Sequence, residues 1–265
     1  MRLNIRHTTQ YEYAEPVPYG VLRLRLTPLT HPTQQVIDWT LAVEGGKLEF
    51  TYADAWGNRT DLITVARGAS AISVTCAGTI DTADTAGVFR PSGPEAPLWL
   101  FERVTPLTTP GAAIAALAAS VGGIADRLAL LHALSAAIHE RLQYLPGSTS
   151  VLTEAEAALT AGAGVCQDHA HVFIAAARHL GIPARYVSGY LMMPDRTEQT
   201  ATHAWAEAHV EGLGWVGFDA ANAVCPDDKY IRIAAGLDYK EAAPITGVRG
   251  GLGGETLAVA VIVEQ

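Results

Sequence analysis

Apolar and polar residues alternate along the first third of the chain. The alternation begins over residues 22–26 and recurs in three later runs, at residues 37–43, 48–52 and 72–76. Apolar side chains at every second position are typical of strands with one buried face. Turn-forming residues at positions 54–58 separate two of these runs. The pattern predicts an antiparallel β-sandwich over residues 1 to about 80.

From residue 111 onward the pattern changes to segments rich in alanine and leucine. Asp126 is a good N-cap for a helix whose apolar residues recur at helical spacing, Leu128, Leu131, Leu134 and Ile138. Thr153 and Glu156 have the spacing of a capping box, ahead of a short helix that ends near Gly162. A longer apolar helix is predicted to start at Cys166 and to end before Pro183. These segments predict a helical layer.

Four apolar runs in the last third predict further strands, at residues 184–193, 204–210, 215–218 and 257–263. With the helices before them they predict an α+β domain, in which an antiparallel sheet packs on the helix that starts at Cys166. Several prolines between Pro91 and Pro110, Pro94 among them, indicate a linker. We therefore expect a β-sandwich domain at residues 1–105 and a catalytic domain at residues 106–265.

The composition limits the partners. The 265 residues carry a formal net charge of −9, and their Lys and Arg residues are scattered, so we expect neither nucleic-acid nor membrane binding. The N-terminus has no apolar signal-peptide segment, and no run approaches the ~20 apolar residues of a membrane span. The three cysteines are too few for a disulfide framework. These features predict a cytoplasmic protein, and they leave its oligomeric state open.

Cys166 is the candidate nucleophile. It stands after Gly162 and Gly164 at the predicted start of a helix, where free N–H groups and the helix dipole stabilise a thiolate. The alternative for a free cysteine is a buried structural role, which is the expectation for Cys76 and Cys225 because they lack such a setting. Cys166 therefore needs a base and an acid nearby to qualify as catalytic.

His203 and Asp219 are the candidates for these two roles. If the loop between their strands spans residues 210–214, His209 faces Trp215, and Asp219 lies diagonal to His203 on the same face of the hairpin. A carboxylate there can fix the imidazole tautomer and stabilise the imidazolium, while the other ring nitrogen takes the thiol proton. The alternative role for Asp219 is a structural cap before residues 220–222.

At these positions the chain resembles a known family, the bacterial transglutaminase-like superfamily, which has a papain-like cysteine protease fold. Four segments carry the resemblance: Gly164-Val165-Cys166-Gln167-Asp168, residues 181–190, His203-Ala204-Trp205 and residues 214–219. The resemblance covers about residues 110–240, and the β-rich front resembles the N-terminal domain of bacterial members. It implies a Cys166-His203-Asp219 triad and acyl transfer at a carboxamide through a thioester, usually with hydrolysis and without a cofactor.

Four further residues are candidates for the oxyanion hole or the substrate pocket: Tyr144, Gln167, His169 and Trp205. The backbone N–H of Cys166 is one expected oxyanion donor, because the charge would develop over the helix terminus. Tyr144 matches a tyrosine segment of the family and is a candidate for the second donor. His169 departs from the family pattern, in which an aromatic residue is expected, so it is a candidate to contact the thiolate or line the pocket.

Other functions remain open at this point. Cys166, His169 and His203 could supply three metal ligands, but no paired-cysteine or His-Glu-x-x-His spacing supports this, so we expect no metal. Transfer of the acyl group to an amine and a non-catalytic peptide-binding module are the alternatives on the same fold. The sequence favours a thiol-dependent amidase or peptidase that acts on a peptide or protein substrate.

Overall fold

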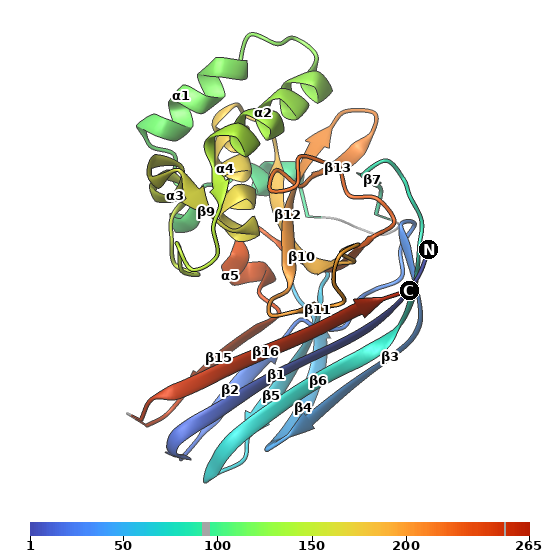
Figure 1. The fold of residues 1–265 in the computed structure, drawn as a ribbon, viewed down its shortest axis with the longest axis vertical. Helices are drawn as coiled ribbons and strands as arrows, with labels where there is room; N and C mark the ends of the chain where they lie inside the picture. Colours follow the sequence, from blue (N-terminus) through green and yellow to red (C-terminus); the bar gives the residue numbers. More distant parts are fainter. Residues whose placement is uncertain (92–95, 252) are drawn as a thin grey trace.

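The computed structural model describes residues 1–91, 96–251 and 253–265, so Pro94 of the expected linker lies outside the described residues. A β-sandwich forms one end of the molecule, and a sheet covered by helices forms the other (Figure 1). None of the helices in these parts of the chain is both long enough and apolar enough to cross a membrane.

Two antiparallel sheets make up the sandwich. The first has the order β11 (Glu198–Gln199), β16 (Glu255–Glu264), β1 (Arg2–Val17), β6 (Ala69–Thr82) and β3 (Gln34–Glu44). The second has the order β15 (Ile245–Arg249), β2 (Gly20–Leu24), β5 (Arg59–Val65) and β4 (Gly46–Ala53). Leu24, Ile63 and Val74 are fully buried in the core between them. The alternation of the first third of the chain therefore predicted this sandwich correctly.

The C-terminal strands complete the sandwich. The strand expected at residues 257–263 exists as β16, but it pairs with β1 from Asn4↔Glu264 to Tyr13↔Glu255 instead of joining the helix-covered sheet. Its Val261 and Val263 are fully buried, on the same face as Ile5 of β1. Strand periodicity shows which face is buried, but it does not show which sheet supplies the partner. Both ends of the chain therefore build the sandwich.

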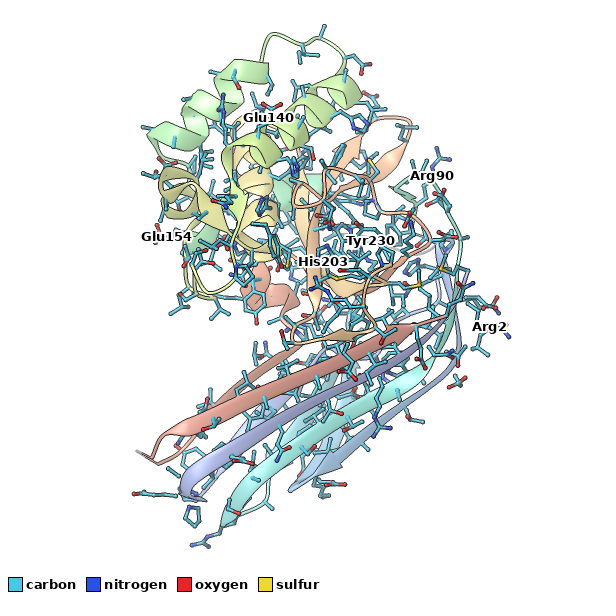
Figure 2. The ribbon with its side chains drawn as sticks, viewed as in Figure 1. Arg2, Arg90, Glu140, Glu154, His203 and Tyr230 are labelled. Atoms are coloured by element: carbon cyan, nitrogen blue, oxygen red, sulfur yellow. The ribbon has the colours of Figure 1, made fainter. Side chains whose placement is uncertain are left out.

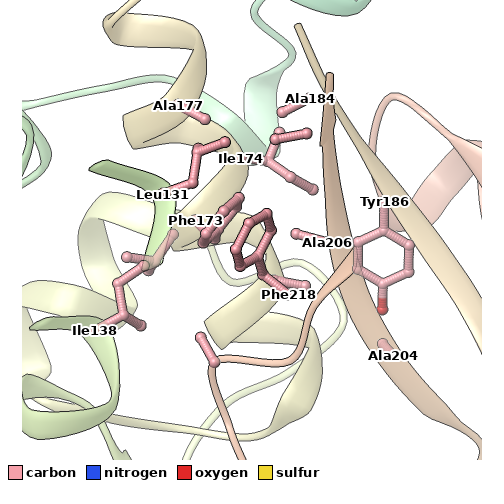
Figure 3. Close-up of a cluster of buried hydrophobic side chains, with 14 of the residues drawn as sticks. Leu131, Ile138, Phe173, Ile174, Ala177, Ala184, Tyr186, Ala204, Ala206 and Phe218 are labelled. Carbon is pink, nitrogen blue, oxygen red and sulfur yellow. The ribbon is translucent and has the colours of Figure 1, made fainter. Parts of the chain in front are cut away.

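The helix-covered sheet positions the candidate site. Its order is β14 (Tyr230–Gly236), β10 (Ala184–Leu191), β12 (His203–Val210), β13 (Gly214–Phe218) and β7 (Val88–Phe89). Helix α4 (Cys166–His179) packs on one face of this sheet through Phe173, which stacks on Phe218 with ring centroids 5.0 Å apart. Figure 3 shows these rings with the small Ala206 of β12, which lets the helix approach closely. The expected antiparallel sheet on the Cys166 helix is confirmed.

The remaining elements surround α4. They are η1 (Leu98–Glu102), η2 (Pro106–Thr108), α1 (Ala112–Val121), α2 (Arg127–Arg141), α3 (Ala155–Ala161), α5 (Tyr239–Ala242) and the parallel pair β8 (Gln143–Tyr144) and β9 (Ala163–Gly164). Asp126 caps α2 as expected, because its side chain accepts the N–H of Ala129 at 2.7 Å.

The capping box expected at α3 does not form. The hydroxyl of Thr153 accepts the N–H of Ser150 instead, at 2.9 Å. The Glu156 carboxylate reaches across to the start of α1, where it accepts the N–H groups of Gly111, Ala113 and Ile114 at 2.7 to 3.0 Å. Helix α1 begins after Gly111 and has no side-chain cap of its own, so its free N–H groups attract this carboxylate.

Replacing Glu156 by alanine tests this contact between α1 and α3. Glu156→Ala leaves three N–H groups of α1 without their acceptor, so we expect the free energy of unfolding to fall by about 2 kcal/mol. Urea denaturation at neutral pH measures the loss. Glu140→Ala, on the exposed side of α2, is the control and should change stability by less than about 0.5 kcal/mol. Equal losses in the two variants would contradict the assignment.

Candidate active site

Cys166 is the first residue of α4, and its position is fixed by Asp168. The Asp168 carboxylate reaches back to accept the N–H of Val165, the N-cap residue, at 2.8 Å, and it also accepts the Thr149 hydroxyl at 2.6 Å. Gly164 is required here, since a Cβ on it would lie 2.6 Å from the Cβ of Asp168. The half-buried Cys166 side chain therefore lies at a rigid helix N-terminus, which favours negative charge.

His203 is the first residue of β12, and Asp219 directly follows β13. The hairpin that joins them has the expected register, with His209 opposite Trp215. This register brings the two buried side chains together, and Nε2 of His203 lies 2.6 Å from Oδ2 of Asp219. Nδ1 is therefore the ring nitrogen that does not bond Asp219, and Cys166 lies close enough to His203 to raise the pKa of its imidazole.

The Asp219 carboxylate is enclosed by donors. Besides His203, Oδ2 accepts Nδ2 of Asn222 at 2.7 Å and the hydroxyl of Tyr230 at 2.8 Å. Oδ1 accepts the backbone N–H groups of Ala221 and Asn222 at 3.1 and 3.2 Å. Burial alone would favour the neutral acid, but the hydrogen bonds from His203, Asn222 and Tyr230 hold the pKa of Asp219 below its usual value. Asp219 is therefore ionised at neutral pH.

The charge of Asp219 controls the protonation of His203. Burial favours the neutral ring, but the hydrogen bond to Asp219 and the neighbouring Cys166 outweigh it and raise the pKa of His203 to about 10. Figure 2 shows His203 and Tyr230 near each other where the helix-covered sheet approaches the sandwich. His203 therefore holds its proton at neutral pH, next to Cys166.

A cavity of about 520 Å³ opens beside His203 and has room for part of a peptide. Tyr144, Tyr230 and Asn222 line it together with the apolar side chains of Leu191, Met192, Met193 and Val224. Its charged side chains are Asp195, Arg196, Asp227 and Lys229.

Of the expected pocket residues, Tyr144 lies at the cavity. It is half exposed, and β8 pairs it with Gly164, two residues before Cys166. Burial and the neighbouring Cys166 raise the pKa of Tyr144, so its hydroxyl keeps the proton that it could donate. Gln167 does not line the cavity, because its side-chain amide donates to the carbonyl of Val151 at 3.4 Å.

His169 and Trp205 have supporting positions. Both ring nitrogens of the buried His169 lie 2.9 Å from backbone carbonyl oxygens, those of Val165 and Leu142. His169 therefore connects the end of α2 to the start of α4, and it does not line the cavity. Within the described parts of the chain, no three His, Cys, Asp or Glu side chains form a metal-binding group. Trp205 is buried against Tyr230, and its ring stacks on His203 with centroids 6.4 Å apart.

Tyr230 and Asn222 are the two residues of the site that sequence reasoning missed. Asn222 stands three positions after Asp219, a spacing typical of a turn in which side chain and backbone bond each other, so a signal for it exists. Tyr230 has no such signal. It reaches Asp219 from an edge strand whose partner is β10, and that pairing is not visible in the sequence.

Two family models match the chain. Residues 115–220 match the transglutaminase-like superfamily, and residues 3–81 match the bacterial transglutaminase-like N-terminal region. An uncharacterised protein of Mycobacterium leprae is 29% identical, covering 100% of this chain and 99% of that protein. An uncharacterised protein of Mycobacterium tuberculosis is 27% identical, covering 93% of this chain and 87% of that protein.

Among solved structures, the chain is similar to a protein from Cytophaga hutchinsonii that is proposed to be a cysteine protease. The two superpose with a TM-score of 0.80 at 24% identity, covering 100% of this chain and 91% of that one. The likeness extends over the sandwich as well as the helix-covered sheet, so the two parts share one arrangement in both proteins.

Thiol labelling distinguishes Cys166 from the other cysteines. Burial raises the pKa of Cys76 to about 11 and also raises that of Cys225, whereas Cys166 has an imidazole partner and a helix N-terminus. We expect brief iodoacetamide treatment at neutral pH, followed by peptide mapping, to label Cys166 at least about tenfold faster than Cys225. Cys225 is the matched control because it is also half-buried. His203→Ala should slow Cys166 alone, and equal labelling of all cysteines would contradict an activated thiol.

The raised pKa of His203 also predicts how stability depends on pH. The folded protein keeps the imidazole proton up to about pH 10, whereas the unfolded chain releases it near 6.5. The contribution of His203 to stability is therefore complete below pH 6.5 and is lost as the pH rises through about 10. Urea unfolding of the wild type and His203→Gln across this window should show a shrinking difference in free energy. A difference that stays constant or grows would contradict the assignment.

Proposed function

We propose that this chain, which combines a transglutaminase-like core with a bacterial transglutaminase-like N-terminal region, is a thiol-dependent amidase or peptidase that works through a thioester on Cys166. The observation that carries the proposal is the hydrogen bond between His203 and an ionised carboxylate, with Cys166 close enough to raise the pKa of the imidazole. A nucleophile, a base and an orienting acid in this order form the minimal apparatus for acyl transfer.

We place the proton of the Cys166 thiol on Nδ1 of His203 before the attack, in keeping with the raised pKa of the imidazole. The thiolate attacks the carbonyl carbon of the substrate amide, a C–S bond forms, and the carbonyl electrons move onto the oxygen. The backbone N–H of Cys166 and the hydroxyl of Tyr144 are the proposed donors to this oxyanion. The tetrahedral intermediate then collapses, the C–N bond breaks, and the imidazolium gives its proton to the leaving amine. The acyl group remains on sulfur as a thioester.

Deacylation uses the same groups in reverse. His203, now neutral, takes a proton from water as the water oxygen attacks the thioester carbon. The C–S bond breaks, the carboxylic acid leaves, and the thiolate reforms beside the imidazolium. Asp219 stabilises the imidazolium in both halves of the cycle through the bond to Nε2, and it does not itself take the proton.

We favour hydrolysis over transfer to an amine because, among the described residues, neither tryptophan that could have shielded the cleft lines the cavity. Trp215, which could have shielded the cleft, is fully buried and packs under the guanidinium of Arg185, 3.8 Å from its ring centroid. Trp205 packs on Tyr230 and is also buried. A thioester that water reaches freely is hydrolysed, since protection of such intermediates depends on water exclusion.

Partition of the acyl-enzyme tests this proposal. A library of peptide and isopeptide amides identifies an accepted substrate, which is then incubated with increasing primary amine, and mass spectrometry measures acid against amide product. We expect acid to dominate up to millimolar amine, and Cys166→Ala to lower kcat/KM by at least about 1,000-fold. Dominance of the amide product would assign a transferase. Turnover that survives in Cys166→Ala, or no turnover of any library member, would contradict the proposed enzyme.

A further inference from the structure

Tyr230 reaches the candidate site from a distant strand. It is the first residue of β14, which is separated from β12 in the sheet by β10. Only 9% of its side chain is exposed, its ring meets Trp205 edge-on at 5.5 Å, and its hydroxyl donates to Oδ2 of Asp219 at 2.8 Å. Its ring also lies 5.9 Å from that of His203. The hydroxyl is therefore fixed on the carboxylate that binds the proposed base.

The hydrogen bond from Tyr230 ends on the same oxygen as the bond from His203. Oδ2 of Asp219 accepts three donors, whereas Oδ1 accepts backbone N–H groups. Each neutral donor stabilises part of the negative charge on Oδ2. With these donors, Oδ2 attracts the imidazolium less strongly than it would if His203 were its only partner. Burial and the adjacent Asp219 raise the pKa of Tyr230, so the phenol keeps its proton and remains a donor.

We propose that Tyr230 is a positioning residue that shares Oδ2 of Asp219 with His203 and so keeps the imidazolium able to release its proton to the leaving amine. This inference rests on the proposed amidase function. The step concerned is the collapse of the tetrahedral intermediate, in which the proton on Nδ1 moves to the amine nitrogen as the C–N bond breaks. An amine leaves only when it is protonated, whereas an aryl oxide leaves as the anion, so the two leaving groups differ in their need for this acid.

Other charged or titratable groups face the same site from several elements. Cys166 of α4 and Tyr144 of β8 lie on the side of the nucleophile, and they interact electrostatically with each other. Four charged residues line the cavity, from the segment after β10 and the segment before β14: Asp195, Arg196, Asp227 and Lys229. Asp227 pairs with Lys229 at 3.1 Å. Of the side chains in the described residues, those bonded to Oδ2 of Asp219 are His203, Asn222 and Tyr230.

The test compares an anilide and a phenyl ester of one accepted acyl group in Tyr230→Phe. The variant keeps the ring and its contact with Trp205 but removes the donor, so Asp219 holds the imidazolium more tightly. We expect kcat/KM for the anilide to fall about tenfold, and kcat/KM for the ester to change less than about twofold. In the pH profile of kcat/KM for the anilide, the fall on the alkaline side should move to higher pH by about one unit.

Two variants serve as comparisons. Asn222→Ala removes the other neutral side-chain donor from Oδ2, so it should change the ratio of kcat/KM for the ester to kcat/KM for the anilide in the same direction. If Tyr230→Phe does not fold, Asn222→Ala replaces it in the test. Tyr190→Phe removes a buried hydroxyl that bonds His7 at 2.9 Å and Cys76 at 3.5 Å instead of Asp219. We expect Tyr190→Phe to lose stability but to keep both the ratio and the pH limb.

Each alternative result has a defined meaning. An equal fall for ester and anilide, or an alkaline limb that stays in place or moves to lower pH, would show that Tyr230 only supports the fold and would overturn the inference. In that case wild-type turnover through Cys166 would leave the proposed function standing. Failure of the wild type to cleave either substrate would contradict the proposed function and, with it, the inference.

Discussion

The hydrogen bond between His203 and Asp219 joins two strands that the fold brings together by hairpin register, and the rest of the site is arranged around it. A buried carboxylate is costly unless its oxygens are bonded, and Asp219 satisfies this requirement with donors from three segments. The same bonds keep it ionised, and its charge in turn keeps His203 protonated. Helix α4 then needs only to present Cys166 to the remaining ring nitrogen.

The sandwich takes part in holding this geometry. The segment that leads into His203 pairs through β11 with β16, and the N–H of Val263 donates to the carbonyl of Thr197 at 3.1 Å. A second, buried contact joins the sandwich to the helix-covered sheet: His7 of β1 bonds the hydroxyl of Tyr190 on β10 at 2.9 Å. Burial lowers the pKa of His7 to about 4, so it remains neutral under ordinary conditions. The N-terminal region and the last strand are thus structural supports of the site.

The sequence was most informative where the relevant contact is local. The alternation of side chains along the two strands predicted Asp219 beside His203, because a hairpin fixes its own register. Asp126 was predicted as the N-cap of its helix, because a cap acts within one turn. The sequence was less informative about contacts between distant segments. Glu156 left its own helix for the N–H groups of α1, β16 joined the sandwich, and Tyr230 reached Asp219 from an edge strand. His169 was a candidate to contact the thiolate or line the pocket, but both of its ring nitrogens lie against backbone carbonyl oxygens.

The central claim is that Cys166 carries the acyl group during turnover. The most direct measurement is rapid acid quenching of the protein with an activated ester, followed by peptide mapping by mass spectrometry. The account predicts an acyl mass on the peptide that contains Cys166 within the first turnover, with its formation strongly slowed in His203→Ala. An acyl group found on Cys225, or product formed with no adduct on Cys166 at any quench time, would contradict it.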